Sequence, residues 1–128
     1  MEKTDKIIPS DLGTVRIADE VVAIIAGLAA TEVEGVAGMS GGFAGGISEI
    51  LGRRNLSKGV KVEVGENEAT IELYIIVKYG ARIPDVAWNI QENVKKAVET
   101  MTGLETTKIN VHIQGVEFAG QKEEEENI

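Results

Sequence analysis

Residues 60–79 read VKVEVGENEATIELYIIVKY, and this stretch decides the fold. Valines alternate with charged residues over residues 60–64, and a second alternating run covers residues 70–79. Alternation with a period of two places the apolar side chains on one face of a strand. The intervening residues GENE contain the glycine and asparagine that are typical of a turn. The stretch therefore predicts a β-hairpin with one buried face.

A helix and one more strand follow this hairpin. Pro84 suits the first turn of a helix, and Gly103 suits its end. Between them, one apolar stripe is expected to face the core; it consists of Ile83, Ala87, Ile90, Val94, Ala97, Val98 and Met101. Residues 107–114 alternate again, which predicts a last strand with Ile109, Val111 and Ile113 facing inward.

A strand and a helix precede the hairpin. Residues 13–17 alternate as a short strand, and Asp19 stands where a helix N-cap is expected. The next apolar residues have helical spacing and predict a core-facing side made of Val21, Ile24, Ile25 and Leu28. The opposite side carries small residues, Ala23, Ala26, Gly27 and Ala30, which either accept a second packing partner or simply favour helix formation.

Residues 35–59 form a long connection, in which eight of 25 residues are glycine. We expect this connection to be partly mobile, with one short helical turn around Ile47, Ile50 and Leu51. The element order is then β-α-β-β-α-β, which predicts an α+β fold: a two-layer sandwich, ferredoxin-like or a close variant. The expected domain covers residues 13–118, between a flexible N-terminal arm at residues 1–12 and a disordered acidic tail at residues 119–128.

Length and composition limit the function. A chain of 128 residues suits one core, and a net charge of −8 opposes binding to nucleic acid. The chain has no cysteine and one histidine, which removes disulfides and Cys-type zinc sites. No apolar run approaches the roughly 20 residues that span a bilayer. These features predict a soluble, cytoplasmic protein without a direct transmembrane segment.

No motif for catalysis stands out. His112 lies on the polar face of the last strand with Asn110 and Gln114, and Ser40 has no histidine near it in the sequence. The glycine-rich run at residues 41–48 resembles a phosphate-binding loop but lacks its lysine, because Ile47 follows Gly46. The sequence therefore predicts no enzyme activity, no catalytic residue, no metal site and no cofactor.

Two groups of residues suggest contacts with other proteins. Trp88 is expected to point outward from the second helix, and Tyr74 and Ile76 share the outer face of the hairpin strand. These three residues are candidates for self-association. The second group is an apolar and basic part of the glycine-rich connection, in which Phe43 and Ile47 precede Arg53, Arg54 and Lys58. It predicts a contact with a protein partner or, more weakly, with anionic lipid; alternatively, its apolar residues cap the core and its basic residues are only solvated.

Short phrases along the chain carry a resemblance. They are GTVRIA (13–18), VEGV (33–36), MSGG (39–42), KGVKV (58–62), YG (79–80), IP (83–84), NIQENV (89–94) and VHIQGV (111–116). Their order and spacing resemble the alkaline-shock-protein family, the envelope stress proteins of Gram-positive bacteria.

The resemblance implies a non-enzymatic, cytoplasmic protein of the stress response. It also implies a position at the inner face of the membrane, reached through a membrane-anchored relative. The residues themselves indicate only an interaction domain, with a homo-oligomer expected. Two alternatives stay open: a small-ligand module using the glycine-rich loop, and a nucleic-acid-binding module using the open sheet face, although Tyr74 is the only aromatic residue expected there.

Overall fold

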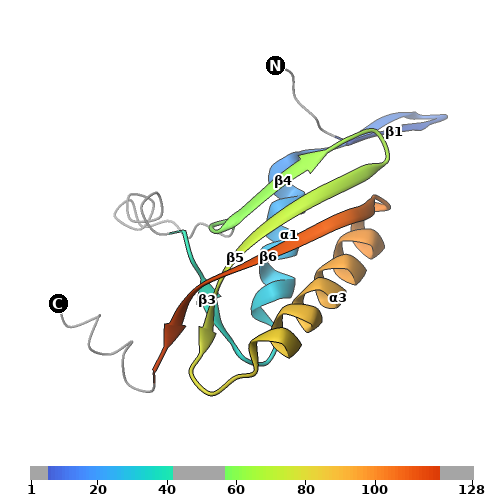
Figure 1. Ribbon diagram of the computed structural model, residues 1–128. Coiled ribbons are helices and arrows are strands. Elements are labelled where there is room, and N and C mark those ends of the chain that lie inside the picture. The colour runs from blue at the N-terminus through green and yellow to red at the C-terminus, as the bar shows by residue number, and fades with distance from the viewer. Residues whose placement is uncertain (1–5, 42–56, 119–128) are drawn as a thin grey trace.

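The computed structural model describes residues 6–41 and 57–118. Two layers make up the domain: a sheet, and a layer of two helices that both lie on one face of it (Figure 1). The α+β fold class predicted from the sequence is confirmed. The elements in chain order are β1 (Lys6–Ser10), β2 (Gly13–Ile17), α1 (Asp19–Thr31), β3 (Val36–Met39), β4 (Val60–Val64), β5 (Glu68–Lys78), α3 (Ile83–Thr102) and β6 (Glu105–Glu117).

Strand β5 is the centre of the main sheet. Along one of its edges β4 and then β3 pair with it antiparallel, so the predicted hairpin of β4 and β5 is confirmed. Along the other edge β6 runs parallel to β5 from Glu105 to Glu117. In a split β-α-β arrangement another strand would separate these two parallel strands. Here they are direct neighbours, so the fold is a variant of the ferredoxin-like arrangement.

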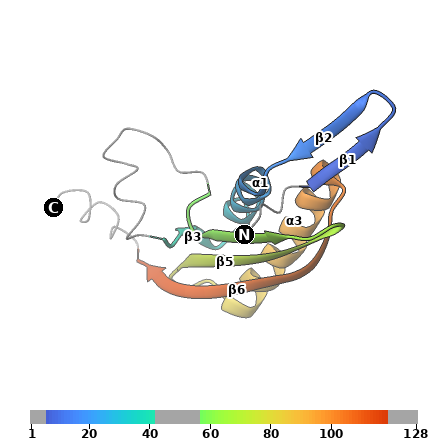
Figure 2. The same ribbon diagram turned by 90° about the horizontal axis from the view of Figure 1, so that it is seen from above.

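The N-terminal segment differs from the expectation. Residues 6–10 form strand β1, which pairs antiparallel with β2 from Lys6↔Ile17 to Ser10↔Gly13, so the expectation of a loose arm is wrong for residues 6–12. Residues 1–5 lie outside the described part. The physical reason is that Ile8 lies opposite Val15, and such an apolar cross-strand pair stabilises a hairpin. This hairpin projects away from the main sheet, so β2 does not join that sheet (Figure 2).

The glycine-rich connection also contains a strand that the sequence pattern hides. Residues Val36–Met39 pair with β5, which shortens the connection at its N-terminal end. Gly35 directly precedes this strand and has a φ of 100°, in the left-handed region that favours glycine. A Cβ at Gly35 would lie 2.7 Å from Val86 Cγ2, so the chain passes very close to α3 here. The helical turn expected around residues 47–51 and the acidic tail at residues 119–128 lie outside the described residues.

Helix α1 packs on a side that only partly matches the prediction. Ile25 packs against the core as expected, but Val21 and Leu28 are 45% and 47% exposed, so the prediction is wrong for these two residues. Val22 and the small residues Ala23, Ala26 and Ala30 are buried instead. Small side chains let α1 lie close to α3, and Asn93 Nδ2 of α3 donates a hydrogen bond of 2.8 Å to the Ala29 carbonyl. Asp19 is not the N-cap; Ala18 occupies that position, and the Asp19 charge lies in the first turn, where it suits the helix dipole.

Helix α3 behaves largely as predicted. Its central stripe is buried, with Ile90, Val94 and Val98 fully inside, and Gly103 ends it with a φ of 77°. The ends differ, because Ile83 and Met101 are exposed while Val86 and Thr102 are buried. The core lies between the helices and the inward side of β5, where Ile71, Leu73 and Ile75 are fully buried.

Candidate interaction surface

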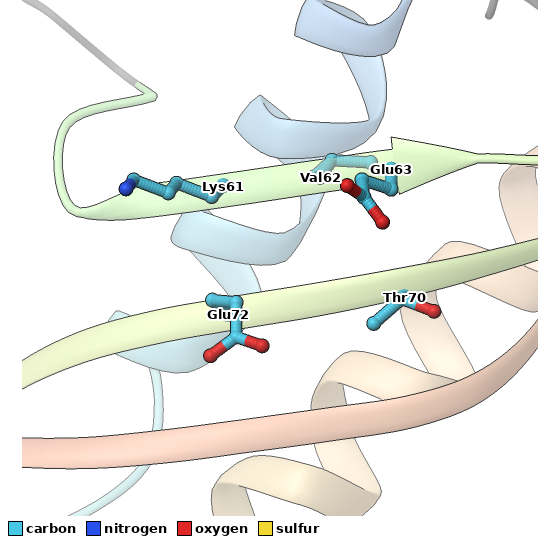
Figure 3. A pocket seen from close by; sticks show the side chains of 5 residues that line it. All are labelled: Lys61, Val62, Glu63, Thr70 and Glu72. Atoms are coloured by element: carbon cyan, nitrogen blue, oxygen red, sulfur yellow. The ribbon is translucent and has the colours of Figure 1, made fainter.

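The face of the main sheet that points away from both helices carries the candidate site. We call this side the open face; among the described residues of β4, β5 and β6 it includes Lys61, Glu63, Thr70, Glu72, Tyr74, Ile76, Lys108, Asn110, His112 and Gln114. Strand geometry places these residues there, because their neighbours in each strand point into the core. Figure 3 shows Lys61, Glu63, Thr70 and Glu72 on this side, while Val62 points toward the helices.

A polar cluster occupies the middle of the open face. The rings of Tyr74 and His112 stack with their centroids 4.7 Å apart and an angle of 12° between their planes. His112 Nε2 lies 2.6 Å from Glu72 Oε1, and Asn110 Nδ2 donates a 2.8 Å hydrogen bond to Glu72 Oε2. Lys61 Nζ lies 6.0 Å from the centroid of the Tyr74 ring. Each carboxylate oxygen of Glu72 therefore has a side-chain partner, and the Tyr74 ring contacts His112 and lies near Lys61.

The electrostatics of the cluster favour a fixed charge over acid–base chemistry. The hydrogen bond from His112, followed by that from Asn110, lowers the pKa of Glu72 below its ordinary value of 4.5. A general base at neutral pH needs a carboxylate whose pKa is raised, as burial without partners would do. Glu72 instead stays charged and hydrogen-bonded at neutral pH, so the cluster is suited to fixing the positions of its side chains on the open face.

Two shallow hollows flank the cluster. One, of about 500 Å³, is lined by the residues of Figure 3. The other, of about 460 Å³, lies between the ends of β3 and β4 and is lined by Ser40, Gly41, Gly59, Val60, Lys61, Tyr74 and Gln114. Ser40 Oγ donates a long hydrogen bond of 3.3 Å to Gln114 Oε1, and none of the described residues that line this second hollow is a histidine or a carboxylate. The described lining thus offers Ser40 no base that could activate it as a nucleophile.

Beyond the cluster, the open face becomes apolar and smooth around Ile76. Its partners on the two neighbouring strands are Gly38 on β3 and Gly115 on β6. A Cβ at Gly38 would meet nothing within 4 Å, and one at Gly115 would meet only Ile76 itself. Glycine within a strand often marks a place where another chain or ligand approaches the backbone closely. Ile76 is therefore a half-buried apolar side chain flanked on both sides by glycines, which add no side chain to the surface.

The structure separates the residues that the sequence suggested for contacts. Tyr74 and Ile76 lie on the open face, whereas Trp88 is 59% exposed on α3, in the helical layer on the other side of the sheet. These three residues cannot form one continuous contact surface. Lys58 lies half-buried just before β4, and Phe43, Ile47, Arg53 and Arg54 lie outside the described residues, so their role stays a prediction.

Sequence reasoning missed the polar cluster itself. The strand spacing of Glu72, Asn110 and His112 predicts that they lie on the outer face of the sheet. It does not predict which of them contact one another. Their contact depends on Tyr74 pairing with His112 across parallel strands. Within residues 6–41 and 57–118, no group of three His, Asp or Glu side chains is arranged to hold a metal ion.

The fold and the open face define a small two-layer α+β domain whose sheet is covered by helices on one side only. Residues 8–118 match the alkaline shock protein 23 family, which is described as having a cell envelope-related function. The chain belongs to this family. The resemblance seen in the sequence is thereby confirmed.

Relatives support the same membership. The protein YqhY of Bacillus subtilis strain 168 is 46% identical over 113 residues, which cover 88% of this chain and 84% of YqhY. YloU of the same strain is 40% identical and covers 81% of this chain and 88% of its own length. A Streptococcus pyogenes protein named stress response regulator gls24 homolog is 29% identical over 98% of this chain and 71% of its own.

Among solved structures, the chain is similar to the MamM CTD, in a variant called H264A-E289A-C267S, at 18% identity and a TM-score of 0.48. The likeness covers 77% of this chain and 95% of the other. In the described part of the chain, neither helix is long and apolar enough to cross a membrane.

Proposed function

We propose that this chain is a non-enzymatic adaptor of the envelope stress response, which binds a protein partner at the cytoplasmic face of the membrane. The observation that carries the proposal is the open face. It presents a fixed polar cluster beside a smooth apolar area at Ile76, and helices cover only the other side of the sheet. Membership in an envelope-related family and a relative named as a stress response regulator support the biological setting.

The make-up of the face favours protein contact over the alternatives. A base that stacks on Tyr74 needs a free ring face, but His112 stacks on one side and Lys61 Nζ approaches the ring as well. The net charge of −8 further opposes nucleic acid. The face instead combines an apolar area at Ile76 with adjoining polar side chains, and protein–protein contacts usually combine both kinds of surface. The shallow hollow beside Ser40 is where a small ligand would bind if the alternative function, a small-ligand module, were correct.

The test compares two lysine substitutions on the same strand and the same face. Ile76→Lys places a charge in the apolar area, where Gly38 and Gly115 leave room for it, and Thr70→Lys places one at the far polar end of β5. We expect Ile76→Lys to lose its partners in a pull-down from membrane fractions and to leave the membrane-adjacent position in cells. Thr70→Lys should keep both. If Ile76→Lys folds and keeps every partner, the adaptor does not use the open face.

The basic cluster of Arg53, Arg54 and Lys58 is a second proposed contact. The double variant Arg53→Glu with Arg54→Glu tests it in the same cells. Basic residues near an anionic surface contribute about 1 kcal/mol each, so lipid alone would give weak and salt-sensitive attachment. Unchanged partners and position in this double variant would assign the cluster a structural role.

A further inference from the structure

The free edge of strand β6 is protected along its first half only. Glu99 Oε2 accepts a 2.9 Å hydrogen bond from the Thr106 backbone N–H, and Lys95 Nζ lies 3.4 Å from the Thr106 carbonyl. Gln91 Nε2 donates a 2.9 Å hydrogen bond to the Ile109 carbonyl. These three side chains stand four residues apart on α3 and therefore form one row along the helix. The row occupies backbone groups that would otherwise attract another strand.

The second half of the edge lacks this protection. The Ile109 carbonyl points away from β5, and backbone direction alternates along a strand, so Val111 and Ile113 also direct their N–H and C=O groups to the free side. Among the described residues, no side chain bonds these groups. One turn before Gln91, the row on α3 continues with Ala87 and Trp88, which cannot replace the polar row, and Trp88 is 59% exposed.

Charge is also missing from this half. Residues 109–116, INVHIQGV, contain no Asp, Glu, Lys or Arg over eight positions, in a chain with 27% charged residues. Free edges are normally blunted by charge, proline or shortness. The opposite edge of the sheet follows this rule, because β4 has five residues and carries Lys61 and Glu63, and the uncharged β3 has only four residues. The uncharged half of β6 is therefore the unprotected edge of the described sheet.

We infer that this half of β6 pairs with the same segment of a second copy of the chain, antiparallel and about a two-fold axis. A copy with a net charge of −8 is repelled by its twin nearly everywhere, but an uncharged segment meets itself without repulsion. A two-fold axis makes such a contact self-complementary and closed. It joins the two sheets and puts α3 of both copies on one side, where the two Trp88 side chains approach each other. The occupant is thus a second copy and not an unrelated peptide.

This inference gives a surface to the homo-oligomer expected from the sequence, and that surface differs from the open face of the proposed adaptor function. Because the chain has no cysteine, one introduced thiol reports on one position. Gln114→Cys lies beside the proposed axis, and Glu63→Cys lies on the opposite edge strand as the matched control. With a short bis-maleimide, we expect Gln114→Cys to form covalent dimers about tenfold faster or more, because pairing raises the local thiol concentration. Equal rates at the two positions would overturn the proposal.

Hydrogen exchange of the unmodified protein gives a second measurement. The N–H groups of Val111 and Ile113 should exchange slowly at high protein concentration and rapidly on dilution, since pairing with a second copy protects them. The Ile75 amide, inside the sheet, should not respond to dilution. Rapid exchange of Val111 and Ile113 at every concentration would refute edge pairing. Ile76→Lys should leave both readouts unchanged, so a failure of the adaptor proposal is distinguishable from a failure of this one.

Discussion

The orientation of α1 makes a quantitative prediction, because the structure buries its alanines and exposes Leu28 and Val21. Leu28 is 47% exposed, and full burial of a leucine side chain stabilises a protein by about 1.5–3 kcal/mol. Leu28→Ala should therefore lower the free energy of unfolding by about 1 kcal/mol. Ala26 is fully buried, so Ala26→Leu inserts extra volume between packed layers and should cost about 1–3 kcal/mol.

The measurement is urea unfolding followed by circular dichroism, with Leu73→Ala as the reference. Leu73 is fully buried in β5, and its truncation should cost about 2–5 kcal/mol. The order of cost is then Leu73→Ala above Leu28→Ala, with Ala26→Leu clearly destabilising. If Leu28→Ala costs as much as Leu73→Ala while Ala26→Leu is tolerated, α1 packs with its large residues inward and the reasoning is wrong.

Two further predictions concern the backbone and pH. Gly35 and Gly80 both have a positive φ, which costs any other residue about 1–2 kcal/mol, but only at Gly35 would a Cβ also meet Val86 at 2.7 Å. Gly35→Ala should thus destabilise by about 1–3 kcal/mol more than Gly80→Ala in thermal or urea unfolding; equal costs would contradict the close passage beside α3. His112 and Asn110 lower the pKa of Glu72 in the folded state, so its contribution is present above 4.5 and is lost as pH falls below that value. Glu72→Gln should therefore reduce the loss of stability between neutral pH and the acidic range, and an unchanged pH profile would show that the cluster does not form in solution.

Sequence periodicity predicted the elements correctly where the apolar residues of a strand or helix all face the same core. The hairpin of β4 and β5 and the buried centre of α3 follow from alternation and from helical spacing, because both sets of apolar residues face one core. The same rule failed at two positions of α1, because Val21 and Leu28 are exposed while alanines are buried. The close approach of α1 to α3, where Asn93 Nδ2 reaches the Ala29 carbonyl, suits small side chains. Val36–Met39 was missed because glycines surround it, although its pairing with β5 holds it in the sheet.

The sequence predicted which residues of the candidate site lie on the outer face of the sheet. It did not predict which of these residues contact one another. The spacing of Tyr74, Ile76 and His112 places each of them outward, and the structure agrees. Which of them touch depends on strand order, and strand order depends on contacts far apart in the sequence. Trp88 is exposed as expected, but the structure places it on α3, away from Tyr74 and Ile76, and its role in self-association stays a prediction. Sequence spacing gives the direction of a side chain but not its neighbours.

The position of β2 decides whether the polar cluster exists. Neighbouring strands lie about 4.8 Å apart, so a strand inserted between β5 and β6 would separate Tyr74 and His112 by about 9.6 Å. The observed ring distance of 4.7 Å and the 2.6 Å contact of His112 with Glu72 require the two strands to be direct neighbours. Because β2 pairs with β1 in a separate hairpin, it does not insert between β5 and β6. The lowered pKa of Glu72 is then a solution marker of the topology. If β2 entered the main sheet, Glu72 would lose both of its partners, and the effect of Glu72→Gln on the acid stability profile would disappear with them.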